Sequence, residues 1–326
     1  MNASADAPLP DAVARTRPPG HPVVALTIAG SDPSGGAGVQ ADLKTFAALG
    51  GYGCAVLTGL TAQSTTGVTR VLPVPADMVT AQLETLFADV AVDTVKIGMT
   101  TDAAVARAVA AALRDLRSAG RAPFVVLDPV MVATSGGRLL APDAEAVLRD
   151  ELLPLADLVT PNLAEAAVLL GVEQARDDGE AAEQALALLQ LGAGFALVKG
   201  GHLDSAESID HLAGPGLGPR PGTAIGPEPV TGPHGERDGV VALTAPRIPT
   251  RNTHGTGCTL SSACAVLRPL HDGWEPALRA AKDYLTEALR AADGLVIGGT
   301  GTVSGPWRGH GPVDHGFAMR GAVPTD

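Results

Sequence analysis

The chain has 326 residues, and its 35 acidic against 23 basic side chains give a formal net charge of −12 at pH 7. This acidic balance disfavours nucleic acid as a partner, and an aromatic content of 3% leaves few side chains on which bases could stack. Hydrophobic residues make up 45% of the chain, which is enough for the core of one large α/β domain or two smaller ones.

The cysteines and the N-terminus indicate a cytoplasmic protein. The three cysteines, Cys54, Cys258 and Cys264, are too few for a disulfide framework and suit a reducing compartment. No apolar run approaches the roughly 20 residues of a membrane span. The first residues also lack the basic-then-apolar order of a signal peptide. We therefore expect no membrane partner.

Residues 1–21 are rich in alanine, proline and polar residues without periodicity, which predicts a disordered tail. Short apolar runs then predict buried strands that begin near residues 23, 54, 94, 124, 157 and 195. Apolar residues at helical spacing predict helices at about 39–46, 78–90, 103–116, 179–192, 259–267 and 275–292. Alternating strands and helices indicate a mostly parallel sheet that binds ligands at the carboxyl ends of its strands. Gly/Pro-rich stretches at 213–239 and 298–309 are expected to be surface insertions.

Candidate ligand contacts follow the first three strands. The glycine-rich turn at 30–38 permits close backbone approach, so it predicts either a site for a polar ligand or a plain tight turn. It matches neither the Walker A nor the GxGxxG pattern. Gln63 follows the second strand and could read the edge of a heteroaromatic ring, or it could be a surface turn residue. Met99 follows the third strand, where a methionine is more typical of core packing than of a ligand contact.

Acidic and amide side chains follow the fourth and fifth strands, and a lysine follows the sixth. Asp128, Asn162 and Glu165 could hold Mg²⁺ through oxygen atoms or water, or they could serve as helix caps and turn residues. Lys199 ends an apolar strand and precedes two glycines, which favours phosphate binding over the role of a surface lysine.

The segment NTHGTGC at 252–258 is the strongest local feature, because its glycines allow the chain to turn sharply into a helix. Such a helix start presents unpaired N–H groups and the positive end of the helix dipole, which together predict an anion site. Cys258 lies at that start, where thiol pKa values fall, so it could be a base or a nucleophile. It could equally be a small buried residue that caps the helix.

A series of motifs closely resembles the hydroxymethylpyrimidine/phosphomethylpyrimidine kinases of thiamine biosynthesis, in the ribokinase-like superfamily. The motifs occur in order over about residues 23–317: AGSDPSGGAGVQADLKTFAALGGYG, TAQSTTGV, VKIGM, LDPVM, LVTPNLAEA, VKGGH, APRIPTRNTHGTGCTLSSA and RGHGPVDH. The resemblance implies a three-layer α/β/α sandwich with a mostly parallel central sheet, formed by a single domain over residues 22–326, and a homodimer. It also implies ATP- and Mg²⁺-dependent phosphorylation of 4-amino-5-hydroxymethyl-2-methylpyrimidine, and then of the monophosphate to the diphosphate.

The resemblance also implies a role for each motif residue. The pyrimidine would meet Gly30, Ala37, Gln63, Met99 and Val130, and Asp42 would orient groups of the substrate site. Cys258 would be the base, beside an anion hole formed by Gly255, Thr256 and Gly257. Asp128 and Glu165 would hold the metal. ATP would be bound by Asn162, Glu165, Lys199, Thr256 and Gly257. Thr61 and Ser64 depart from the residues common in the family, next to the implied pyrimidine pocket.

Two other functions stay open. Pyridoxal is also a hydroxymethyl heteroaromatic compound, so the chain could be a pyridoxal kinase of the same family, although Gln63 and Met99 favour the pyrimidine. A pyrimidine sensor without catalytic activity is the other alternative. The retained phosphate-site residues Lys199, Asn162 and Glu165 count against a sensor.

Overall fold

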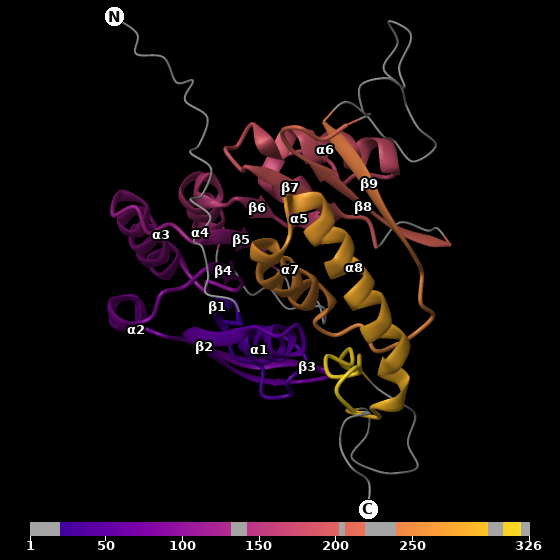
Figure 1. The fold of residues 1–326 in the computed structure, drawn as a ribbon, viewed down its shortest axis with the longest axis horizontal. Helices are drawn as coiled ribbons and strands as arrows, with labels where there is room; N and C mark the ends of the chain where they lie inside the picture. Colours follow the sequence, from indigo (N-terminus) through magenta and orange to yellow (C-terminus); the bar gives the residue numbers. More distant parts are fainter. Residues whose placement is uncertain (1–19, 132–141, 202–205, 219–238, 299–308, 321–326) are drawn as a thin grey trace, which may run out of the picture.

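A nine-stranded sheet forms the centre of the computed structural model, which describes residues 20–131, 142–201, 206–218, 239–298 and 309–320 (Figure 1). The strand order is β3-β2-β1-β4-β5-β6-β7-β8-β9. Pairing is parallel from β2 to β7 and antiparallel where β3, β8 and β9 join. The strands are β1 (Val24–Gly30), β2 (Tyr52–Ser64), β3 (Gly67–Pro73), β4 (Thr94–Ile97), β5 (Phe124–Leu127), β6 (Leu158–Val159), β7 (Phe195–Lys199), β8 (Glu207–Ala213) and β9 (Val240–Pro246).

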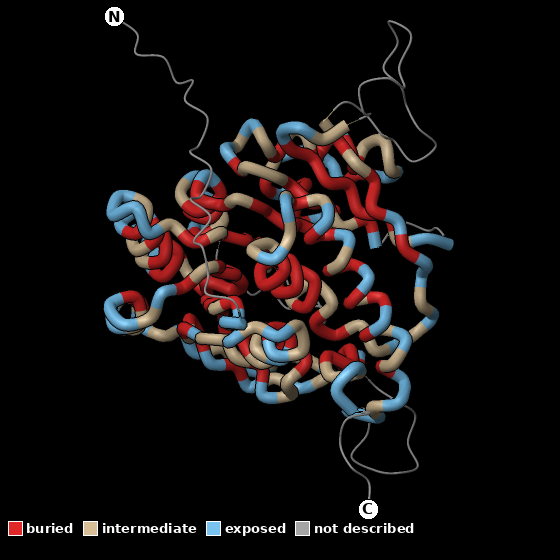
Figure 2. The backbone as a smooth tube through the Cα atoms, in the orientation of Figure 1, coloured by how far each residue is buried: buried red, intermediate tan, exposed pale blue. Residues whose placement is uncertain are grey.

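Helices cover both faces of the sheet and make it the middle of three layers. One core cluster packs α2 to α6 against one face, and a second packs α1, α7 and α8 against the other. Figure 2 shows the buried residues along the strands and the inner sides of the helices. The helices are α1 (Gly38–Ala48), α2 (Ala76–Asp89), α3 (Ala103–Ser118), α4 (Pro142–Val147), η1 (Leu148–Leu152), η2 (Leu153–Leu155), α5 (Leu163–Leu170), α6 (Asp178–Leu189), α7 (Thr256–Leu267), η3 (Arg268–Leu270), α8 (Trp274–Ala291) and η4 (Ala292–Gly294).

The predicted α/β class, the six apolar strands and the mostly parallel pairing are confirmed. The prediction was wrong about the end of β2, which continues to Ser64 because it pairs with β3 as an antiparallel hairpin. Gln63 therefore lies in a strand, opposite Val68, rather than in a turn. Strands β3, β8 and β9 were not predicted. Exposed residues break the apolar pattern of β3 and polar residues break that of β8, while the apolar run of β9 directly follows the stretch assigned to an insertion.

The predicted tail and both predicted insertions fall largely outside the described residues. Residues 213–218 and 239 of the first insertion are described; they lie at the end of β8 and directly before β9. All three cysteines are free thiols, as expected. Among the described helices, none combines the length and the apolar character needed to cross a bilayer.

The parallel strands bring the candidate residues to one edge of the sheet. The carboxyl ends of β1, β4, β5, β6 and β7 point the same way because these strands are parallel. Helix α7 packs across β1, β4 and β5, and it lies near the middle of the molecule in Figure 1. Its first turn therefore meets the ends of the central strands.

Candidate active site

The loop before α7 turns on Gly255, which precedes the helix with a left-handed φ of 80°. A Cβ atom at this position would lie 1.8 Å from the carbonyl oxygen of Gly36, so only glycine lets the loop pack on the glycine-rich turn after β1. The hydroxyl and the N–H of Thr259 both donate to the Gly255 carbonyl at 2.8 Å. The first turn of α7 is thus held firmly, with N–H groups that have no acceptor inside the helix.

Lys199 and Asp128 lie directly beside this helix start. The Lys199 ammonium donates to Asp128 Oδ1 at 3.0 Å, and the Ser261 hydroxyl of α7 donates to Asp128 Oδ2 at 3.2 Å. A Cβ atom on Gly257 would lie 3.2 Å from Lys199 Nζ. Burial alone would raise the pKa of Asp128, but the ammonium groups of Lys199 and Lys96 outweigh it and hold that pKa below its usual value. The cluster joins the ends of β5 and β7 to α7.

Asn162 and Glu165 form a capping box at the start of α5. The Glu165 N–H donates to Asn162 Oδ1, and the Asn162 N–H donates to Glu165 Oε2, both at 2.9 Å. The helix-cap alternative is therefore confirmed for this pair. Burial raises the pKa of Glu165 to about 7; the charge of Lys199 opposes this shift and the charge of Asp128 adds to it. Glu165 therefore belongs electrostatically to the same cluster.

The thiol of Cys258 does not behave as its position at a helix start predicts. Burial raises its pKa to about 11, although the charge of Lys96 and the N–H of Gly38 act in the opposite direction. At pH 7 only about one such thiol in ten thousand is ionised, by the usual titration relation. The expectation of a lowered pKa was wrong, because burial raises the pKa of this thiol and the charges of Asp42 and Asp128 add to the shift.

Behind Cys258 lies a buried ion pair, of which the sequence indicated Asp42 but not its partner Lys96. Lys96 Nζ contacts both carboxylate oxygens of Asp42 at 3.0 Å, and both side chains are 0% exposed. The hydroxyls of Thr27 and Ser262 also donate to this carboxylate, at 2.6 and 2.7 Å. Asp42 is therefore fully engaged by protein groups. Lys96 was missed, although a lysine inside the apolar run TVKIGM was a readable signal.

The residues assigned to the pyrimidine gather next to the loop. A Cβ atom on Gly30 would lie 2.1 Å from Met99 Cε, so these two residues are packed together. Ala37 caps α1, and its N–H donates to Asp32 at 2.8 Å. Gln63 Nε2 lies 3.5 Å from His254 Nε2, one residue before Gly255.

Val130 completes the set assigned to the pyrimidine. Its N–H donates to the carbonyl of Asp128 at 2.8 Å, which holds it just beyond the end of β5. Asp32 and His254 are buried next to these residues and were not assigned from the sequence, although both lie in the quoted motifs.

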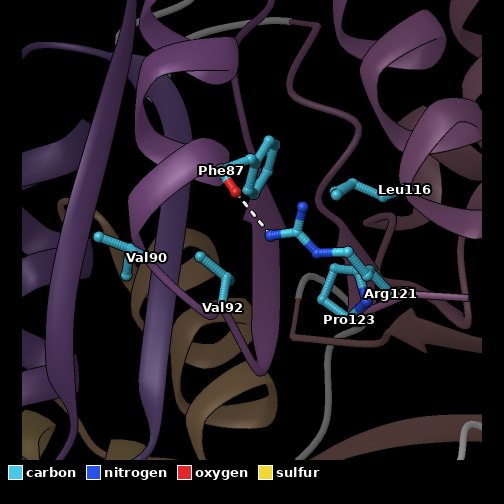
Figure 3. Close-up of a pocket in the computed structure, with 6 residues that line it drawn as sticks. All are labelled: Phe87, Val90, Val92, Leu116, Arg121 and Pro123. Atoms are coloured by element: carbon cyan, nitrogen blue, oxygen red, sulfur yellow. Dashed lines mark hydrogen bonds between the residues drawn. The ribbon is translucent and has the colours of Figure 1, made fainter. Parts of the chain in front are cut away.

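Two cavities lie at opposite edges of the sheet. One of about 530 Å³ lies beside the loop and is lined by Pro249, Thr250, Arg251, Asn252, Asp293 and Val296; its volume is in the range of small-molecule sites. The other, of about 10 Å³, is closed by Arg121, which donates to the Phe87 carbonyl at 2.5 Å (Figure 3). It holds at most one water and lies at the amino ends of β4 and β5, the edge opposite the cluster.

Comparison with known proteins identifies the family. The family described as phosphomethylpyrimidine kinase matches residues 32–217 and 230–306. The hydroxymethylpyrimidine/phosphomethylpyrimidine kinase of Escherichia coli (strain K12) is 48% identical over 291 residues, which are 89% of this chain and 96% of that protein. The enzyme of the same name from Rhizobium meliloti is also 48% identical, over 90% of this chain and 96% of its own length.

Solved structures agree with these sequence matches. The phosphomethylpyrimidine kinase of Clostridium difficile 630 has a TM-score of 0.66 and 35% identity, covering 82% of this chain and 99% of its own. The pyridoxal kinase of Bacillus subtilis, solved as an ADP complex, has a TM-score of 0.72 and 30% identity, covering 92% and 99%. The fold, the ordered motifs and these matches together show that the chain belongs to the phosphomethylpyrimidine kinase family.

Proposed function

We propose that the protein transfers the terminal phosphoryl group of ATP to 4-amino-5-hydroxymethyl-2-methylpyrimidine, and then to the monophosphate that results. The convergence of Lys199 and Asp128 on the first turn of α7 carries this proposal. Phosphoryl transfer requires alignment of the reactants and stabilisation of charge more than covalent catalysis, and this cluster supplies both.

Lys199 and the N–H groups around Gly255 to Gly257 would stabilise the transferred phosphoryl group. Burial alone would lower the pKa of Lys199, but the charges of Asp128 and Glu165 outweigh it and raise that pKa. The ammonium therefore stays protonated at neutral pH. Thr256 lies in the same turn, where it would also contact the phosphates of ATP.

Asp128 and Glu165 are the residues that would hold Mg²⁺, with Asn162 beside them at the start of α5. Mg²⁺ favours oxygen ligands and is commonly bound by one or two carboxylates together with substrate phosphates, so these two residues fit it. Burial raises the pKa of Glu165 to about 7, and the charge of a bound cation would favour the ionised form of this carboxyl group. When bound, Mg²⁺ would neutralise charge on the phosphates.

Cys258 would act in its neutral form. A thiol with a pKa of about 11 is protonated at rest, so it would orient the substrate hydroxyl by a hydrogen bond rather than stand ready as a thiolate base. Asp42 and Lys96 lie behind it and would keep α7 in place through Ser262 in the middle of that helix.

Gln63 would read the aminopyrimidine edge, while Gly30, Ala37, Met99 and Val130 would enclose the ring. The homodimer that the family resemblance implies is also part of the proposal. Exposed apolar side chains on the β2–β3 hairpin support it: Leu60 and Leu72, which are partners in the ladder, are 46% and 54% exposed.

Pyridoxal phosphorylation is the second candidate function. The observation that favours it is the close structural match to pyridoxal kinases, which includes a Staphylococcus aureus structure with AMP-PCP and pyridoxal at a TM-score of 0.73. The two substrates must therefore be compared directly.

The test incubates the purified protein with ATP, Mg²⁺ and either the pyrimidine alcohol or pyridoxal, and resolves the mono- and diphosphate products by mass. We expect both pyrimidine products and a kcat/KM that favours the pyrimidine. Lys199→Met should lower kcat by about 10²–10³, the usual effect of losing one donor that stabilises transition-state charge. Arg279→Met is the control, because this exposed cation on α8 forms an ion pair with Glu275 on its own helix. Tight pyrimidine binding without ATP consumption would instead indicate a sensor, and a preference for pyridoxal above about tenfold, or about 1.4 kcal/mol, would indicate a pyridoxal kinase.

A further inference from the structure

A buried carboxylate–imidazole pair connects the two loops of the site. Asp32 lies in the glycine-rich turn after β1, and His254 lies in the loop before α7. His254 Nε2 is 2.7 Å from Asp32 Oδ2, and the two residues are only 8% and 1% exposed. Neither residue belongs to the phosphate cluster around Lys199, so the phosphoryl-transfer proposal leaves this pair without a role.

The hydrogen bond between them has a defined direction. Asp32 Oδ1 accepts from the N–H and the hydroxyl of Ser34, at 2.9 and 2.7 Å, and Oδ2 accepts from the Ala37 N–H at 2.8 Å. Burial alone would raise the pKa of Asp32, but the hydrogen bonds from His254 and Ser34 outweigh it and keep that pKa below its usual value. An ionised carboxylate only accepts hydrogen bonds. The hydrogen therefore resides on His254 Nε2, which is the donor.

This direction constrains the neighbouring amide of Gln63. Gln63 Nε2 faces His254 Nε2 at 3.5 Å, and its Oε1 faces the hydroxyl of Thr61 at 3.3 Å. A ring nitrogen that carries a hydrogen has no lone pair to accept from an amide nitrogen. A half-turn of the amide group removes this contact between two N–H groups, and it places the amide oxygen toward His254 and the nitrogen toward Thr61. The single hydrogen on His254 Nε2 is directed at Asp32 at 2.7 Å, so it attracts the amide oxygen at the longer distance without a second full hydrogen bond. Because the Thr61 hydroxyl donates to the Ser31 carbonyl at 2.8 Å, its oxygen is able to accept from that nitrogen.

We propose that Asp32 and His254 are positioning residues that hold the Gln63 amide in this one orientation, and so select the ring that the site accepts. The inference rests on the proposed pyrimidine substrate. The fixed amide offers the remaining lone pair of its oxygen and the second hydrogen of its nitrogen side by side. A 4-aminopyrimidine presents the complementary pair, an amino donor next to a ring nitrogen acceptor. Pyridoxal does not, because its hydroxyl and ring nitrogen are separated by a substituted carbon.

The test is a double-mutant cycle between Asp32→Asn and Gln63→Ala, read by the KM for the pyrimidine alcohol and by its Kd from calorimetry without ATP. We expect Asp32→Asn to raise both constants about three- to tenfold, the range for one hydrogen bond, and to leave kcat and the KM for ATP within about twofold. In the Gln63→Ala background, Asp32→Asn should have no further effect. A pyrimidine alcohol that lacks the 4-amino group should likewise bind wild type and Asp32→Asn equally.

His254→Gln is the conservative variant, because its amide nitrogen keeps a donor for Asp32, and it should recover most of the affinity. It also serves as the cycle partner if Asp32→Asn does not fold. His211→Gln is the matched control: His211 is buried on β8 and its ring lies 3.1 Å from Asp178 at the start of α6, without contact to Asp32, His254 or Gln63, so the KM for the pyrimidine should not change. Equal effects of Asp32→Asn with and without Gln63, in an enzyme that turns over the pyrimidine normally, would overturn this inference alone. A wild-type protein that neither binds nor phosphorylates the pyrimidine would overturn the proposed function, and this inference with it.

Discussion

Replacing Lys96 by methionine tests how far the buried ion pair behind the site holds the fold together. Lys96 and Asp42 are both 0% exposed, and the ammonium lies 3.0 Å from each carboxylate oxygen. Methionine fills most of the volume of the lysine chain without its charge. The substitution therefore leaves the Asp42 carboxylate buried without a counter-charge, and this uncompensated charge is the main energetic cost of breaking a buried ion pair.

The expected loss of stability follows from what remains around Asp42. Removal of one partner from a buried ion pair typically costs about 3–5 kcal/mol. Thr27 and Ser262 still donate to the carboxylate, at 2.6 and 2.7 Å, and these bonds stabilise the isolated charge in part. We therefore expect the lower end of that range, about 3 kcal/mol. The double variant Lys96→Met/Asp42→Asn carries no buried charge at this place and should lie within about 1–2 kcal/mol of wild type, because a neutral amide keeps at least one hydrogen bond.

Urea unfolding followed by circular dichroism measures this directly, with the free energy of unfolding taken from the midpoint and the slope. The double variant should unfold at a higher urea concentration than the single variant. A single variant as stable as wild type, or a double variant no more stable than the single one, would refute the reasoning. Either result would mean that the charge of Asp42 does not depend on Lys96.

Three further predictions concern the loop and its surroundings. Gly255→Ala should destabilise the protein far more than Gly171→Ala, as thermal melting of the two variants measures. Both glycines have left-handed φ values, of 80° and 68°, so the backbone strain is shared. At Gly255 the new Cβ would also lie 1.8 Å from the Gly36 carbonyl oxygen, whereas at Gly171 no atom lies within 4 Å. Cys258→Ser should keep kcat within about tenfold of wild type at pH 7.5, because a hydroxyl replaces a thiol that is already neutral at a pKa of about 11. Burial lowers the pKa of His315 from 6.5 to about 4, so on acidification the unfolded chain binds a proton at this residue before the folded chain does. The free energy of unfolding should therefore fall by at most about 3 kcal/mol as the pH drops from about 6.5 to 4. Urea unfolding of wild type and His315→Gln at each pH measures this loss.

Each of these predictions has a clear contrary result. Equal melting temperatures for the two alanine variants would mean that the loop moves away from the glycine-rich turn at little cost. A loss of kcat beyond about 10³-fold in Cys258→Ser, with Cys54→Ser unaffected, would indicate an essential thiolate, since a general base contributes about 10²–10⁴. His315→Gln keeps a donor for Thr259, which lies 3.0 Å from the imidazole, so an acid sensitivity equal to that of wild type would assign the pH dependence to other groups.

The amino-acid sequence by itself determined the parts of this protein that depend on local pattern. The apolar runs at β1, β4, β5 and β7 are recognisable because strands buried on both faces carry few polar residues. The rule that ligands bind at the carboxyl ends of parallel strands then indicated Asp128 and Lys199 before any coordinates. The turn at Gly255 was also predictable, because a glycine pair before a helix is a local signal.

Only the tertiary structure decided what depends on residues far apart in the chain. Strands β3 and β8 form because partners exist for them in the sheet, since their own residues give no clear strand pattern. The pairing of Asp32 with His254 joins positions 222 residues apart, which no local signal predicts. The pKa of Cys258 is raised by burial and by the nearby charges of Asp42 and Asp128. These are properties of the folded environment rather than of the helix start on which the residue lies.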